Sequence, residues 1–198
     1  MSSSTDKIHV MIDLETLSTR YDASIISIGA IKFNPHGDDR AEFENWMSDP
    51  DLTLDSDKYF CAYLIPSQAG HIEAETIIWW LQHPEAGKEA AKAIHTEEAA
   101  LNAFTDWLGS TRNLVIWAKS PSADCVWLKN AWNRQGKTST PWGFRSERDV
   151  RTIQEIARDV SGKSIKEWKP NSILTHTPLV DCALQIYQVQ ESFRMMKK

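Results

Sequence analysis

Residues 10–33, VMIDLETLSTRYDASIISIGAIKF, decide the fold of this chain. The segment IHVMID (8–13) is apolar and ends on an acid, and the segment IISIGAIKF (25–33) is β-branched and partly alternating. Turn-forming residues, Asn34 to Gly37, stop the second segment. Runs of this kind, bounded by turn residues, are typical of strands. The stretch therefore predicts two neighbouring strands that pair as a hairpin.

The first strand carries two acids, Asp13 and Glu15, at its end. In an extended backbone, residues i and i+2 point to the same side, so both carboxylates would face one spot. Two oxygen donors on a rigid strand suit a hard divalent cation such as Mg²⁺. An isolated pair at this spacing is more often a solvated strand end, so the interpretation depends on what the rest of the chain contributes.

Beyond the hairpin, hydrophobic periodicity predicts further strands and then helices interleaved with a strand. Strands are expected at 42–47, 59–65 and 113–118, and helices at 72–83, 96–108, 122–133, 150–160 and 178–189. This order favours an α/β fold with a mixed sheet flanked by helices. The expected organisation is a polar tail at 1–7, a single domain over 8–190 and a C-terminal tail at 191–198.

Within these helices the apolar spacing predicts which side chains face the core. Residues Ile77, Trp80 and Leu81 form an i, i+3, i+4 stripe that Pro84 is expected to end. For the helix after Thr96, a predicted N-cap, the expected apolar face consists of Ala99, Ala100, Ala103, Phe104 and Trp107.

Composition places the chain among globular proteins. Its 198 residues are 41% apolar and 25% charged. The sequence contains no run of 18 apolar residues, so no membrane span is predicted. The N-terminal residues lack the apolar core of a secretory signal. Three widely spaced cysteines, Cys61, Cys125 and Cys182, favour reduced thiols in a cytoplasmic compartment over a disulfide framework or a zinc site.

The net charge of −5 is unevenly distributed. Residues 1–118 carry 8 basic against 19 acidic side chains, whereas residues 119–198 carry 14 against 8. The first part could hold cations and the second could face an anionic partner, although random clustering on a solvated surface explains the asymmetry equally well.

The stretch 10–33 resembles the first motif of the DEDD superfamily of 3′–5′ exonucleases, whose fold is ribonuclease H-like. Two later stretches extend the resemblance in the same order. The segment WAKSPSADCVWLKNAW (117–132) places Asp124 at a helix start after a strand, as in the second motif. The segment HTPLVD (176–181) places His176 five residues before Asp181, similar to the histidine version of the third motif. Together the motifs resemble the DEDDh (DnaQ-like) exonucleases over residues 9–187.

Two further features resemble a phage and bacterial subgroup of that superfamily, which includes exonuclease A-like and exoribonuclease-like proteins. They are the pair Trp79-Trp80 and the segment RDVRTI (148–153). The third motif departs from the family's usual H-x-A-x-x-D, because Pro178 and its neighbours fill the gap. Proline is tolerated in the first turn of a helix, so the departure bears on where His176 points rather than on Asp181.

The resemblance implies a role for each of five residues in a mechanism with two Mg²⁺ or Mn²⁺ ions. Asp13 would bridge the metals, Glu15 and Asp181 would complete the site on the nucleophile side, and Asp124 would act directly or through water. His176 would be the general base, a role that suits its ordinary pKa near 6.5. The implied reaction is release of nucleoside 5′-monophosphates from the 3′ end of a single strand.

The implied partner is single-stranded nucleic acid, with DNA favoured over RNA, and a homodimer is left open. The expected location is the cytoplasm of a bacterium or a phage-infected cell. Residues expected at the substrate are Thr16, Leu17, Trp79 and His176. The alternatives are an exoribonuclease that trims RNA 3′ ends, another ribonuclease H-like activity such as an endonuclease, and a catalytically silent nucleic-acid-binding module on the same fold.

Each site residue also has a plain structural interpretation. Asp124 could be a helix-capping acid near Ser120 and Ser122, His176 an ordinary loop histidine and Asp181 a solvated helix acid. For Asp149, an ion pair with the flanking Arg148 and Arg151 is favoured over a place in the cleft.

The tryptophan pair poses a question of helix phase. Successive helix residues are about 100° apart, so Trp79 and Trp80 cannot both face the core. We assign Trp80 to packing. Trp79 is then either a stacking platform for an unpaired base or packs under the acidic loop of residues 48–58.

Overall fold

The computed structural model describes residues 7–49, 52–109, 113–170 and 177–197. Its centre is a five-stranded mixed sheet in the order β3-β2-β1-β4-β5. Strand β1 pairs antiparallel with β2, which pairs antiparallel with β3, while β4 runs parallel to β1 and β5 parallel to β4. The strands are β1 (Ile8–Thr16), β2 (Ile25–Phe33), β3 (Tyr59–Tyr63), β4 (Leu114–Ala118) and β5 (Glu147–Asp149).

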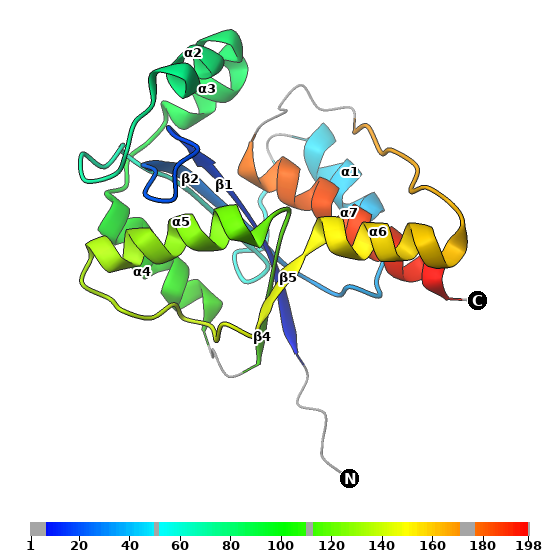
Figure 1. The fold of residues 1–198 in the computed structure, drawn as a ribbon. Coiled ribbons are helices and arrows are strands. Elements are labelled where there is room, and N and C mark those ends of the chain that lie inside the picture. Colours follow the sequence, from blue (N-terminus) through cyan, green and yellow to red (C-terminus); the bar gives the residue numbers. More distant parts are fainter. Residues whose placement is uncertain (1–6, 50–51, 110–112, 171–176, 198) are drawn as a thin grey trace.

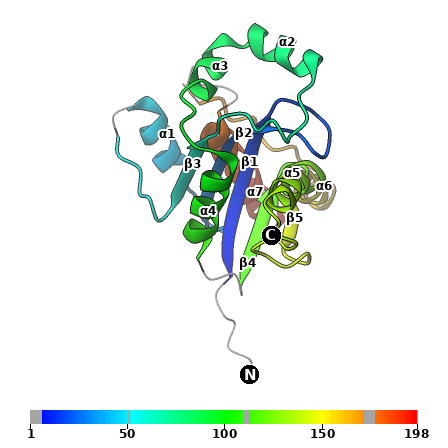
Figure 2. The same cartoon turned by 90° about the vertical axis from the view of Figure 1, so that its left-hand side faces the viewer.

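Helices cover both faces of the sheet and one of its ends (Figures 1 and 2). On one face, α4 and α5 enclose a core with β1, β2 and β4. On the other face, α1, α6 and α7 pack with the same sheet around a second core. The helices are α1 (Arg40–Ser48), α2 (Ala74–Gln82), α3 (Pro84–Ala90), α4 (Glu97–Leu108), α5 (Pro121–Arg134), α6 (Val150–Ser161) and α7 (Pro178–Met196). In the described part of the chain no helix combines the length and apolar character needed to cross a membrane.

Alternation along β1 decides which face the acids take. Val10, Ile12 and Leu14 belong to the core under α4 and α5, whereas Met11 belongs to the core under α7. Because side chains alternate along a strand, Asp13 and Glu15 lie on the same face as Met11, which is the face covered by α7.

Gly29 sets the distance between α7 and the sheet. A Cβ atom at this position would lie 2.6 Å from the backbone carbon and the Cβ of Pro178, so a larger residue would push the helix away. Gly29 is also the β2 partner of Asp13 in the strand register. An isolated glycine in a strand commonly marks such a close approach of backbone. The start of α7 therefore lies directly beside the acidic end of β1.

Helix α2 is attached to the end of the hairpin through Trp80. The indole N–H donates to the carbonyl oxygen of Thr16 at 3.0 Å, and the ring packs with Leu17 and Ile26. Trp80 is therefore a packing residue, as its place in the stripe predicted.

Two expected elements are wrong, and one helix was not predicted. Residues 42–47 form part of α1 rather than a strand, because Phe43, Trp46 and Met47 have the spacing of a helix face. Pro84 ends α2 as expected but also begins α3, which no periodicity had predicted. Helix α7 continues to Met196 through most of the segment expected as a tail, since Val189, Gln190 and Ser192 remain buried against the sheet side of the helix.

Two expected core faces need correction as well. Leu81 is 75% exposed, because the buried face of α2 is centred on Trp80 and leaves Leu81 on its outer side. In α4, Ala99 and Ala103 are exposed, and the buried face is formed by Ala100, Leu101, Phe104 and Leu108. Thr96 is the N-cap as predicted, and its side chain accepts a hydrogen bond from the Ala99 N–H.

Candidate active site

Three carboxylates converge where β1 ends beside α7. Asp13 and Glu15 come from β1, and Asp181 comes from the first turn of α7. One oxygen atom from each lies within 4.8 Å of the others, and all three side chains are partly buried. Residues 168 positions apart in the chain thus form one oxygen-rich cluster, which we call the carboxylate cluster.

A fourth acid, Asp124, approaches the cluster from α5. Its side chain is buried, and its Oδ1 accepts a hydrogen bond from the Leu14 N–H at 3.2 Å. The pairing of β1 with β4 stops at Met11, so the Leu14 N–H lies beyond the backbone hydrogen bonds that join these two strands. The bond attaches the start of α5 to the residue between Asp13 and Glu15, which a helix-capping acid would not do.

Burial raises the pKa values of Asp13, Glu15 and Asp124, and repulsion between carboxylates adds to the shift at Asp13 and Glu15. For Asp13 the pKa is raised well above its ordinary value, first by burial and then by the negative charges of Asp124, Glu15 and Asp181. Burial followed by the charges of Asp181 and Asp124 raises the pKa of Glu15 to about 8. Burial also raises the pKa of Asp124 to about 7, although the hydrogen bond from Leu14 opposes the shift. Carboxylates crowded in this way need protons or a cation to balance their charge.

Gln185 also contacts the carboxylate cluster, although the sequence pattern did not predict it. Its Nε2 donates to Asp13 Oδ1 at 2.7 Å, and its side chain is 5% exposed. The hydrogen bond lowers the pKa of Asp13 and so opposes the effect of burial. The available signal was its position four residues after Asp181, which puts both on one face of the helix.

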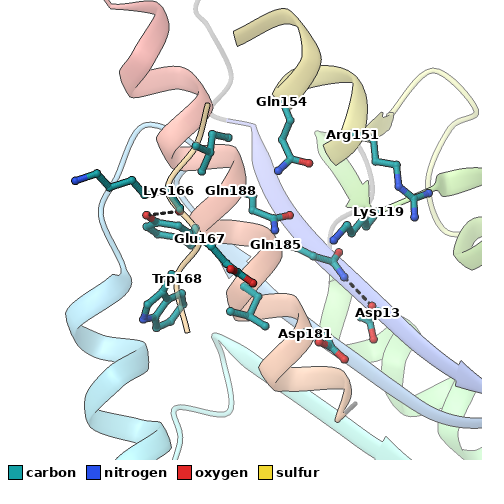
Figure 3. A pocket seen from close by; sticks show the side chains of 13 residues that line it. Asp13, Lys119, Arg151, Gln154, Lys166, Glu167, Trp168, Asp181, Gln185 and Gln188 are labelled. Carbon is teal, nitrogen blue, oxygen red and sulfur yellow. Dashed lines mark hydrogen bonds between the residues drawn. The ribbon is translucent and has the colours of Figure 1, made fainter. Parts of the chain in front are cut away.

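A cavity of about 680 Å³ opens beside the carboxylate cluster (Figure 3). Asp13 and Asp181 lie at one part of its wall, with Gln185 next to them. Lys119 and Arg151 line another part, so the cavity has acidic and basic regions. A groove of this size suits a small polar ligand or a short part of a longer one.

The residues expected at the substrate are placed in different ways. His176 lies outside the described residues. Thr16 and Leu17 follow the acids directly; the Thr16 hydroxyl donates to the Ser18 carbonyl oxygen at 2.7 Å. Leu17 lines a separate apolar cavity of about 410 Å³ together with Trp80.

Trp79 and Asp149 have local partners. The Trp79 ring stacks on His83 with centroids 4.0 Å apart and meets Trp80 edge-on with centroids 5.1 Å apart. Asp149 caps α6 by accepting hydrogen bonds from the N–H groups of Arg151 and Thr152, and it also accepts one from Ser120. The favoured ion pair of Asp149 with its flanking arginines is therefore replaced by capping bonds to backbone.

Comparison with known proteins places this site in a family. The model of a family described as the 3′-5′ exoribonuclease Rv2179c-like domain matches residues 8–193. No curated protein matches the chain.

Solved structures share the fold at low sequence identity. The zinc-bound form of the E. coli ExoI–ssDNA complex superposes with a TM-score of 0.66 at 13% identity, covering 94% of this chain and 40% of that one. E. coli exonuclease I in complex with a dA16 oligonucleotide superposes with a TM-score of 0.66 at 13% identity, covering 96% of this chain and 42% of that one. Cell-death related nuclease 4 (CRN-4) gives 0.65 at 13% identity over 96% and 64%. The chain thus spans about two fifths of the ExoI chains it matches, and the likeness confirms the predicted ribonuclease H-like α/β fold.

Proposed function

Because the chain belongs to the family of Rv2179c-like 3′-5′ exoribonuclease domains, we propose that it is a metal-dependent 3′–5′ exonuclease that acts on single-stranded nucleic acid. The observation that carries the proposal is the carboxylate cluster of Asp13, Glu15 and Asp181, which unites both ends of the matched region. The predicted membership of the DEDDh exonucleases is confirmed at the level of family and fold.

The donor set fits a divalent cation. Three carboxylate oxygens lie within 4.8 Å of one another, and burial followed by repulsion raises the pKa values of Asp13 and Glu15. Such oxygens are hard ligands that a cation would stabilise. We propose Mg²⁺ or Mn²⁺ and two ions, held by Asp13, Glu15 and Asp181, with Asp124 contributing directly or through water. A bound divalent cation supplies charge stabilisation at phosphate oxygens and lowers the pKa of bound water.

The chain's own residues then have distinct tasks. Asp13 is oriented by Gln185 Nε2, and Asp124 fixes the β1 backbone between the two strand acids through the Leu14 N–H. The two contacts occupy one oxygen of Asp13 and one of Asp124. The other oxygen of each carboxylate is left for a metal ion. His176 would accept the proton of the attacking water as general base, and Thr16, Leu17 and Trp79 would contact the terminal nucleotides.

The substrate we propose is an RNA 3′ end, because the family is described as exoribonucleases. DNA, which the sequence resemblance favoured, is the alternative. Telling the two apart requires only one or two contacts to a 2′-hydroxyl.

The experiment that tests the proposal compares matched single-stranded RNA and DNA oligonucleotides, labelled at either end, with Mg²⁺, Mn²⁺ or chelator. We expect stepwise loss of the 3′ label with metal and none with chelator. A circular single strand serves as the control, since an exonuclease needs an end; its cleavage would indicate an endonuclease. Binding without any hydrolysis, under every metal condition, would support the silent binding module instead.

A further inference from the structure

The cavity beside the carboxylate cluster has a basic region that the hydrolytic site does not use. Lys119 and Arg151 both line it, on the side of β4 and α6 (Figure 3). We infer that these two side chains bind a backbone phosphate of the substrate strand, the one that neighbours the phosphodiester held at the carboxylate cluster. The inference rests on the proposed function, because it assumes that a nucleic-acid strand enters the site.

Strand pairing brings the two cations together at the edge that carries the acids. Ala118 on β4 pairs with Asp149 on β5 in a parallel register, so the residues that follow each of them leave the sheet side by side. Strands β1, β4 and β5 run in the same direction, and their carboxyl ends therefore lie along one edge. Ligands of open α/β sheets bind at this edge.

Backbone and side-chain contacts fix the basic region. The Arg151 guanidinium donates to Ser120 Oγ, and Asp149 accepts from the Ser120 N–H at 3.3 Å. Ser120 has a φ of 100°, a left-handed conformation that costs a non-glycine residue energy. These bonds connect the residue after Lys119 to the first turn of α6. The bonds thus hold the Arg151 guanidinium beside the residue that follows Lys119 in the chain.

The charges in this region are available to a ligand. Among the described residues, neither Lys119 nor Arg151 forms an ion pair, although the charge of Arg151 acts on Asp124 and lowers the pKa of that acid. One guanidinium donor is engaged by Ser120, which leaves the others for a phosphate. The first turns of α5 and α6 begin beside these side chains and add partial positive charge.

Neutral hydrogen-bonding groups extend the basic region across the cavity. The amides of Gln154 and Gln188 line the same cavity (Figure 3), and Gln188 Oε1 is buried with no hydrogen-bond partner in the described part of the chain. Lys166 and Glu167 line another part of the cavity. The part lined by Lys119, Arg151 and these two amides suits a sugar–phosphate unit, which offers oxygen acceptors to the cations and hydroxyl donors to the amides.

The first test measures binding of single-stranded oligonucleotides in chelator, where no hydrolysis is expected, over a series of salt concentrations. Lys119→Gln is compared with Lys129→Gln, an exposed lysine on α5 that does not line the cavity. We expect Lys119→Gln to weaken binding about 10-fold and to reduce the salt slope by about 0.7, the value for one phosphate of a single strand. Lys129→Gln should match the wild type. An unchanged affinity and slope for Lys119→Gln would overturn the inference.

The second test asks which phosphate is bound. A dinucleotide contains only the phosphodiester that is cleaved, whereas a trinucleotide adds one neighbour. We expect Lys119→Gln to lower the trinucleotide-to-dinucleotide ratio of kcat/KM about 10-fold. An equal loss on both substrates would place Lys119 at the cleaved phosphate and overturn the inference. If the wild type hydrolyses neither substrate with any metal, the proposed exonuclease fails, and the salt-slope series still decides the phosphate site.

Discussion

Asp13 is the residue on which the candidate site converges. It is held by the β1 backbone and by a hydrogen bond from Gln185, and two further carboxylates lie close to it. Its position between Met11 and Glu15 on the α7 side of the strand follows directly from alternation. The strand β1 supplies Asp13 and Glu15, and α7 supplies Asp181 and Gln185, so changes at single residues can separate the ligands from their supports.

We expect Asp13→Asn to reduce exonuclease activity by more than about 100-fold, beyond the range for losing an outer contact to a metal ligand. The fold should persist, and the Mg²⁺-induced rise in Tm should shrink, because a ligand that binds only the folded state stabilises it. Thermal melting with and without Mg²⁺ measures this. Asp159→Asn, an exposed acid on α6, is the control and should keep both activity and shift. A full Tm shift with normal activity in Asp13→Asn would remove this residue from the site.

Gln185→Ala should cost about 10–100-fold in activity, since Asp13 then loses the donor that orients it. The same change should weaken the Mg²⁺ dependence of Tm, which a purely structural substitution would leave intact. Gln188→Ala, three residues later along the same cavity wall, touches no carboxylate of the cluster and should keep the full Mg²⁺ dependence of Tm. An equal loss of the Mg²⁺ dependence of Tm in both variants would mean that Gln185 has no specific role at Asp13.

At the scale of elements, the contact between α7 and β2 determines where Asp181 lies. Gly29→Ala would place a Cβ 2.6 Å from the Pro178 backbone, so either the helix or the strand must shift. We expect destabilisation of about 1–3 kcal/mol, as for other overpacked sites, and an activity loss beyond what the unfolded fraction explains. Denaturant unfolding and specific activity at low temperature test this.

The control for that prediction is Gly87→Ala in α3, where the added Cβ would lie 3.7 Å from the Trp80 carbonyl oxygen, an ordinary contact. Alanine is favoured over glycine inside a helix by up to about 1 kcal/mol, so this variant should be neutral or more stable. If Gly29→Ala behaved in the same way, the close approach would not limit the position of α7.

The orientation of α2 gives a second prediction at this scale. Trp80→Ala should destabilise the protein by about 3–5 kcal/mol, because it opens a cavity against Leu17 and Ile26 and removes the bond to Thr16. Leu81→Ala should change stability by no more than about 0.5 kcal/mol, since Leu81 is exposed. Chemical denaturation of both variants measures the difference. The reverse order of stabilities would show that the helix is rotated from the orientation described above.

At the scale of the whole molecule, the crowded acids couple stability to pH and to metal. Without metal, the pKa values of Glu15 and Asp124 in the folded state are about 8 and about 7. In the unfolded chain these acids have their ordinary pKa values of 4.5 and 3.8, so they lose their protons at a lower pH. Groups with raised pKa values contribute stability at low pH that is lost as the pH rises through them. In chelator, Tm should therefore fall between pH 5 and pH 8.

Mg²⁺ at pH 8 should restore much of that loss, because it replaces the lost protons as the balancing charge. Glu15→Gln should show a shallower fall in chelator. For a chain of this size each 1 kcal/mol moves Tm by about 2–4 °C, so scanning calorimetry across the pH series resolves the effect. A Tm in chelator that rises over this range, or an identical slope in Glu15→Gln, would contradict the linkage.

Local pattern by itself determined the elements that carry strong periodicity. The hairpin of β1 and β2, the N-cap at Thr96 and the packing of Trp80 follow from alternation, capping and helical spacing, which act over a few residues. The order of acidic motifs also indicated the family, which the match over residues 8–193 confirms. Short amphipathic segments do not distinguish a strand from a helix. Residues 42–47 are helical in the structure, where Phe43, Trp46 and Met47 all pack in the core beneath α7.

Only the tertiary structure decided how the site is assembled. The contact of Gly29 with Pro178, the bond from Leu14 to Asp124 and the bond from Gln185 to Asp13 join residues more than 100 positions apart. The raised pKa values likewise depend on burial. The placement of Lys119 and Arg151 along one sheet edge depends on the strand order. Local sequence sets which way a side chain points along its own element, whereas the distance between elements depends on packing over the whole chain.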